Sequence, residues 1–96
     1  MSNDFDLIHN HHERAVFGAV ARRAEDHPDL LEQPDLLGDV ACVALNRLPP
    51  RYIRHEVDFA FYVSEKERLE TEQAVDEAVD FAFQFVLARV AMRART

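Results

Sequence analysis

The sequence predicts a mainly helical protein with three principal helices, one short β element after a double proline, and assembly into a homodimer. The 96 residues include only two glycines and four prolines, which favours long helices over a turn-rich β sandwich. Neither residue type occurs after Pro50, so a helix that begins near Ser64 can continue to about Met92. A chain of this length has room for one hydrophobic core, and residues 1–96 are expected to form a single domain.

The first helix is predicted over residues 4–25, where apolar residues recur close to the 3.6-residue period. Ser2, Asn3 and Asp4 are candidate N-caps, because such side chains accept hydrogen bonds from the free N–H groups of a helix start. The helix should end by His27, since a residue before proline is disfavoured from helical backbone.

Residues 26–36 hold two prolines and four acidic residues, and this composition predicts a loop with room for one short turn. A second helix should run from Leu37 to Leu48. Pro49 and Pro50 end it there, because proline fixes φ and has no N–H to donate.

Three polar residues on the second helix are candidates for a special role. Asp39, Cys42 and Asn46 follow one another at i, i+3 and i+7, so they share one face. Asp39 lies near the predicted helix start, where a carboxylate complements the positive end of the helix dipole. Contact with a ligand is the alternative role for Asp39. Cys42 stands between Ala41 and Val43, which favours a buried and inert thiol.

Apolar and polar positions alternate over residues 57–63, and this period of two predicts a strand. A strand needs a hydrogen-bonding partner, and the chain offers no second segment of comparable quality. The expected partner is therefore the same strand of another copy. The alternative is an extended, unpaired segment whose phenylalanines pack against the helices.

The third helix should begin at Ser64, because Ser64 and Glu67 fit a capping box. Its second half carries two apolar stripes, where a single core needs one. The second stripe therefore predicts burial against another subunit. The stripes are Val75, Val79, Ala82, Val86 and Val90, and Ala74, Ala78, Phe81, Phe85 and Ala88.

Charge and composition exclude several classes of function. The net charge of −7 weighs against binding to nucleic-acid polymers, which needs a basic surface. No apolar run reaches the roughly 18 residues of a membrane span, and the N-terminus is acidic, so a cytoplasmic protein is expected. The single cysteine excludes an internal disulfide and a cysteine-based zinc site.

Histidines near the N-terminus are the one candidate metal site. If His9, His12 and Glu13 share a helical face, two imidazoles and a carboxylate could converge on an ion. A structural site needs about four ligands, and surface histidines are the alternative. The sequence also lacks the motifs of hydrolases, nucleotide-phosphate loops and dinucleotide-binding folds. We expect no catalytic residues, no metal and no cofactor.

The run DVACVALNRLPPRYI, from Asp39 to Ile53, resembles the signature of the late-competence ComFB family. Asn10, Glu13 and Val16 match the Asn-x-x-Glu-x-x-Val spacing of its first helix, and the resemblance extends from about residue 9 to residue 88. It implies a non-enzymatic regulatory protein that influences competence or motility. Some cyanobacterial members are receptors for cyclic di-GMP or cyclic di-AMP. The zinc-binding cysteines that many members carry before the second helix are absent here.

The local basic cluster after the second helix would suit such a ligand. Guanidinium groups bind phosphates, tyrosine stacks on purines, and a carboxylate accepts from the guanine edge, which favours cyclic di-GMP. Surface pairing of the arginines with the excess acids is the alternative. The candidate ligand-binding residues are Asn10, Glu13, Asp39, Asn46, Arg47, Arg51, Tyr52 and Arg54.

Two functions follow from these patterns. In the first, the protein is a cyclic dinucleotide receptor, and its dimer passes occupancy to a protein partner of unknown identity. In the second, it is a dimeric interaction adaptor that needs no small molecule.

Overall fold

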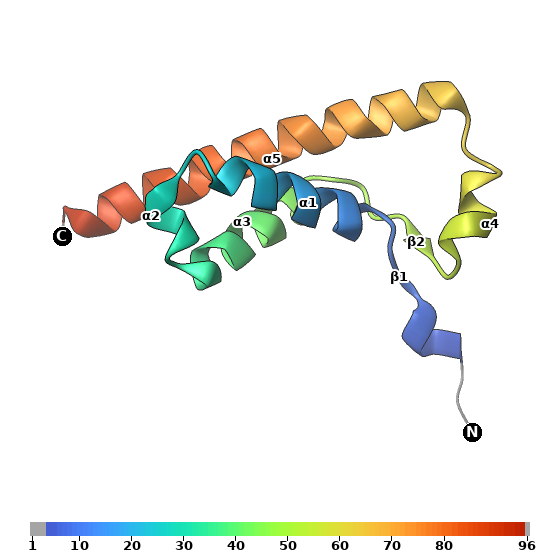
Figure 1. Cartoon of the computed structure of the whole chain (residues 1–96), viewed down its shortest axis with the longest axis horizontal. Coiled ribbons are helices and arrows are strands. Elements are labelled where there is room, and N and C mark those ends of the chain that lie inside the picture. The colour runs from blue at the N-terminus through green and yellow to red at the C-terminus, as the bar shows by residue number, and fades with distance from the viewer. Residues whose placement is uncertain (1–3, 96) are drawn as a thin grey trace.

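The computed structural model describes residues 4–95, and helices dominate it (Figure 1). The three principal helices of the prediction are α1, α3 and α5. In chain order the elements are the 3-10 helix η1 (Asp4–Leu7), β1 (His9–Asn10), α1 (His12–Ala24), α2 (Pro28–Leu31), α3 (Pro34–Asn46), β2 (Tyr52–Ile53), α4 (Glu56–Ala60) and α5 (Glu65–Ala94).

The hydrophobic core lies where α1 and α3 pack against α5. Figure 1 shows α5 running along the whole length of the molecule, with α1, α2 and α3 on one side of it. Val16 of α1, Val40 of α3 and Val79 of α5 are fully buried at this junction. The first turns of α5, α4 and the two strands extend beyond the core. Within residues 4–95, no helix is both long and apolar enough to cross a membrane.

The first helix begins later than the period of its apolar residues predicted. Residues 4–7 form η1, His9 and Asn10 form β1, and α1 starts at His12. The proposed caps Ser2 and Asn3 lie outside the described residues. The predicted end was right, because α1 finishes at Ala24, before His27.

The predicted loop over residues 26–36 is largely helical. It contains the one-turn helix α2, and α3 begins at Pro34, three residues before the predicted start. Both helices have proline in their first turn, where its missing N–H leaves no hydrogen bond unmade. α3 ends at Asn46, ahead of the double proline as predicted.

The earlier start of α3 changes the positions of two polar residues. Asp39 is an interior residue of α3, so the dipole role assigned to it at the helix start was wrong. Cys42 is exposed, which corrects the expectation of a buried thiol. Their shared face is turned to solvent, and the core is formed by Val40, Ala41 and Ala44 on the opposite side.

The β element after the double proline is present, but it differs from the predicted strand over residues 57–63. β2 pairs antiparallel with β1 of the same chain, with His9 opposite Ile53 and Asn10 opposite Tyr52. The segment predicted as a strand instead forms α4 and a following turn. Its N–H groups bond locally instead, as from Phe59 to the His55 carbonyl at 3.1 Å.

α5 confirms the predicted third helix. The Ser64 hydroxyl accepts from the Glu67 N–H at 3.1 Å, and the helix continues to Ala94. One apolar stripe is buried in the core, whereas Phe81 and Phe85 of the other are 39% and 42% exposed. Their rings stack with centroids 5.9 Å apart. Burial of this face against a second subunit stays a prediction.

Candidate functional site

The side chain of Asn10 joins the start of α1 to the loop that follows the double proline. Its Oδ1 accepts from the His12 N–H at 3.1 Å and from the Arg51 N–H at 3.3 Å. Its own N–H donates to Glu13 Oε2 at 3.2 Å. This reciprocal pattern of Asn10 and Glu13 caps α1 in the manner of a capping box.

Backbone hydrogen bonds hold the same loop from the other side. The His11 N–H donates to the Arg51 carbonyl at 2.7 Å, directly beside the ladder between β1 and β2. Both polar groups of the Arg51 backbone are therefore bonded to the β1–α1 junction. The backbone of Arg51 is therefore held in place, although its side chain is about half exposed.

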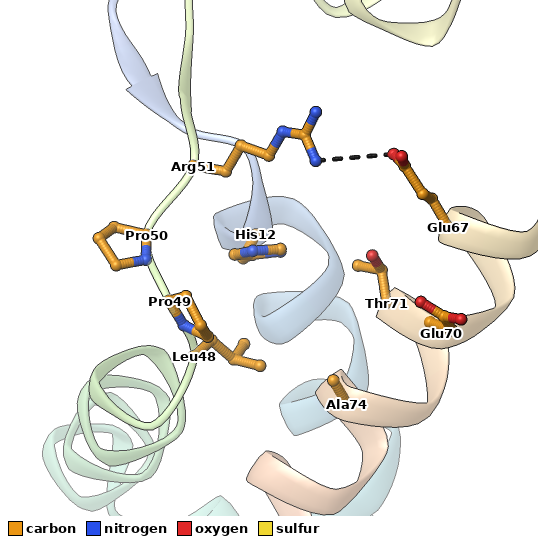
Figure 2. Close-up of a pocket in the computed structure, with 9 residues that line it drawn as sticks. All are labelled: His12, Leu48, Pro49, Pro50, Arg51, Glu67, Glu70, Thr71 and Ala74. Carbon is orange, nitrogen blue, oxygen red and sulfur yellow. Dashed lines mark ion pairs between the residues drawn. The ribbon is translucent and has the colours of Figure 1, made fainter. Parts of the chain in front are cut away.

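Arg51 projects into a cavity of about 310 Å³ between the Pro-Pro loop and α5 (Figure 2). The loop forms one wall with Pro49 and Pro50, α5 forms the other, and His12 lies at the base. Nη1 of Arg51 is 3.8 Å from Glu67 Oε2 across the opening. The remaining lining residues are Leu48, Glu70, Thr71 and Ala74.

A second cavity of about 210 Å³ shares His12, Arg51 and Thr71 with the first. Its apolar wall includes Phe59 of α4, and the Arg51 guanidinium lies over that ring at 4.6 Å from the centroid. Arg51 thus lies between two adjoining cavities.

His12 is the most deeply buried polar residue at this junction, with 8% of its surface exposed. Burial, followed by the neighbouring charges of His11 and Arg51, lowers the pKa of His12 below its ordinary value of 6.5. Its Nδ1 is buried and has no hydrogen-bond partner within residues 4–95. The base of the cavity thus holds a neutral imidazole beside the cationic guanidinium of Arg51.

The histidines near the N-terminus converge on α4 instead of on one another. His9 lies in β1 and His12 in α1, so the candidate helical cluster of His9, His12 and Glu13 does not form. His9 Nε2 is 3.0 Å from Glu56 Oε1, and His11 Nδ1 is 3.3 Å from Glu56 Oε2. Among residues 4–95, no three His, Cys, Asp or Glu side chains form a group that could hold a metal ion. The expected lack of a metal stays a prediction.

A family model described as late competence development protein ComFB matches residues 9–90. The chain belongs to the ComFB family. The match covers both the Asn10–Glu13 cap and the Pro-Pro loop, so every residue that holds Arg51 in place lies within the matched region. Comparisons with curated proteins and with solved structures found no match. Membership of ComFB makes this a competence-related regulatory protein.

The structure brings some of the predicted ligand-binding residues together. Asn10, Glu13, Arg51 and Tyr52 meet at the β1–β2 ladder and the start of α1. Asn10 and Glu13 are engaged in the cap described above. Tyr52 is 68% exposed.

The other predicted residues occupy different places. Asp39 lines a small hollow between α3 and α5, together with Arg89 and Arg93. The Arg47 guanidinium lies 3.7 Å from the centroid of the Phe81 ring on α5. Asn46 and Arg54 are exposed, at the end of α3 and just after β2.

Sequence reasoning missed His12, Phe59 and Thr71 as residues lining these cavities. A signal for His12 was present, because it precedes the buried Val16 by four residues and therefore lies on the inner face of α1. Phe59 was missed because the alternating pattern of residues 57–63 predicted a strand, whereas Phe59 lies in α4.

Proposed function

We propose that this ComFB-family protein is a non-enzymatic receptor that binds cyclic di-GMP beside the Leu48–Arg54 segment. It acts as a homodimer, and binding of the ligand changes its interaction with a protein partner. The observation that supports this most is the placement of Arg51. Its backbone is fixed by Asn10 and His11, while its guanidinium lies between two adjoining cavities.

Preorganisation is the physical reason for preferring Arg51 as the phosphate-binding residue. The double proline and the backbone bonds to Arg51 restrict the loop before a ligand arrives, so less ordering entropy is lost on binding. A guanidinium fork can donate two hydrogen bonds to one phosphate. The exposed ring of Tyr52 offers a stacking surface for a purine on the same short segment.

Acidic side chains around the larger of these two cavities oppose the binding of an anionic ligand. Glu67 and Glu70 line it together with Arg51, so a dianionic ligand must compete with carboxylates. The Arg51–Glu67 pair is long at 3.8 Å and both side chains are about half exposed. Such pairs contribute about 0–1 kcal/mol, so a phosphate can displace Glu67 at small cost.

Calorimetry with cyclic di-GMP, cyclic di-AMP and a linear dinucleotide tests the receptor proposal. We expect cyclic di-GMP to bind at micromolar concentration or more tightly, with an affinity that weakens as salt is added. Arg51→Ala should reduce the affinity by roughly ten- to a hundred-fold, because one charge-assisted contact contributes about 1.5–3 kcal/mol. Arg14→Ala, which removes an arginine lining a different hollow on α1, is the matched control and should leave the affinity unchanged.

The adaptor function is the second candidate, and one observation favours it. The stacked pair Phe81 and Phe85, with Arg47 and Arg89 over its rings, presents an apolar and cationic surface on α5. If none of the cyclic dinucleotides produces heat or a thermal shift, the receptor proposal fails and the adaptor is favoured.

A further inference from the structure

The short helix α4 is attached to the rest of the molecule by polar contacts. None of its five described residues is buried. Glu56, its first residue, bonds to His9 and approaches His11, and the ring of Phe59 lies 4.4 Å from that of His11 between centroids. Since Phe59 forms a wall of the cavity that holds Arg51, the position of α4 determines how open that cavity is.

The geometry of His9 requires a proton on each ring nitrogen. Nδ1 is 2.8 Å from the Leu7 carbonyl oxygen, and Nε2 is 3.0 Å from Glu56 Oε1. A carbonyl oxygen and an ionised carboxylate can only accept hydrogen bonds, so both nitrogens must donate. Neutral imidazole has one N–H, and one of the two contacts would then place lone pairs against each other.

We propose that His9, His11 and Glu56 form a protonation-dependent latch that holds α4 against β1 and closes one wall of the Arg51 cavity. At mildly acidic pH the imidazolium of His9 bonds to both acceptors and α4 is held. At alkaline pH His9 keeps one N–H for two acceptors and loses its positive charge opposite Glu56, so the hold on α4 weakens and Phe59 can leave the guanidinium of Arg51. If the proposed function is also right, access of cyclic di-GMP to Arg51 depends on pH, and this last step rests on that function.

The pKa directions of the latch residues define its pH range. The bond to Glu56, and then the Leu7 carbonyl, raise the pKa of His9 above its ordinary 6.5. The bond to His9 lowers the pKa of Glu56 below its ordinary 4.5. The stabilisation is thus fully present between these ordinary values. It is lost as pH rises through the pKa of His9, and also as pH falls through that of Glu56.

Other charges face the latch from the neighbouring elements. Glu13 of α1 acts on His9 in the same direction as Glu56, whereas His12 lies beside His11 with ring centroids 5.7 Å apart. From α5, Glu65 and Arg68 line a cavity together with His11 and Glu56. Arg51 approaches from the Pro-Pro loop, and Asp58 lies on α4 itself. These surrounding groups carry both signs, and Glu56 directly contacts His9. We therefore expect the His9–Glu56 bond to have the largest effect on the pKa of His9.

Nuclear magnetic resonance of the ligand-free protein tests the latch. Ring ¹⁵N shifts of His9 should show two protonated nitrogens at pH 6, with a raised pKa that falls in Glu56→Gln. Asp58→Asn, which removes an exposed carboxylate from the same helix, should leave the titration unchanged. An unchanged pKa of His9 in Glu56→Gln would overturn the proposal.

The mobility of α4 provides an independent readout. Heteronuclear NOE values of residues 57–60 should be high at pH 6 and fall at pH 8.5 in the wild type. They should be low at both pH values in His9→Gln and follow the wild type in His55→Gln. Equal heteronuclear NOE values at pH 6 and pH 8.5 in the wild type would contradict the latch. A latch that works in a protein without affinity for cyclic di-GMP would instead show that the receptor proposal is wrong.

Discussion

Asn10 accepts the N–H of Arg51 at 3.3 Å, across 41 positions of sequence. The same Oδ1 accepts the N–H of His12, so one amide side chain both caps α1 and positions the loop that carries the guanidinium. Asn10 was expected to contact ligand, and the structure gives it a supporting contact to the residue that we propose binds ligand.

Replacing Asn10 should therefore lower stability. Asn10→Ala leaves the N–H groups of His12 and Arg51 without their acceptor, and should reduce the free energy of unfolding by about 1–3 kcal/mol. Denaturant unfolding measures this change. Asn46→Ala alters an exposed asparagine at the end of α3 and should stay within about 0.5 kcal/mol of the wild type. Equal effects of the two substitutions would contradict the cap.

The exposed stripe of α5 predicts self-association. Phe85→Glu places a charge in the middle of the Phe81–Phe85 surface, and burial of an unpaired carboxylate there would cost several kcal/mol. Sedimentation should show a dimer for the wild type and a monomer for the variant. Phe17→Glu, which changes an exposed phenylalanine on α1, should remain dimeric. A wild type that sediments as a monomer at micromolar concentration excludes this interface.

Cys42 should react readily in the folded protein. Its side chain lies on the exposed face of α3, so a thiol reagent needs no unfolding to reach it. We expect stoichiometric modification of the native protein by a disulfide reagent at a rate within about tenfold of that in denaturant. Cys42→Ser should change stability by no more than about 0.5 kcal/mol. Modification that occurs only on unfolding would mean that the thiol is buried after all.

The burial of His12 should make the protein less stable in acid. Because the folded-state pKa of His12 lies below the ordinary 6.5, the unfolded chain takes up this proton first as pH falls. The stabilisation from a neutral His12 is present above pH 6.5 and is lost as pH drops through the folded pKa. Between pH 7 and pH 5, the unfolding free energy should fall less steeply in His12→Gln than in the wild type. A slope in His12→Gln as steep as that of the wild type would refute the assignment.

Local sequence signals predicted the long helices well because their causes are local. The capping pair Ser64 and Glu67 defines the start of α5, and the absence of proline and glycine lets it continue. The double proline ends α3 by removing the N–H groups that a further turn would need. The run around Pro49 also pointed to the ComFB family, which the match over residues 9–90 established.

Segments with weak local preferences were decided by distant contacts. Residues 57–63 alternate like a strand, but in the folded chain they pair with no strand and close their hydrogen bonds locally, in α4 and the turn after it. β1 itself carries no strand signal. It forms because Asn10 and His11 bond to Arg51 across the fold.

The sequence by itself determined the helical class, the limits of α5, the end of α3 and the family, since each depends on residues a few positions apart. The tertiary structure alone decided that Asn10 bonds to the loop carrying Arg51, that Arg51 lies between two cavities, and that His9 and His11 meet Glu56. Those relationships join residues about forty positions apart. They exist only once packing of α1 and α3 on α5 has brought the two strands together, because no local hydrogen bond or periodicity encodes a contact at that separation.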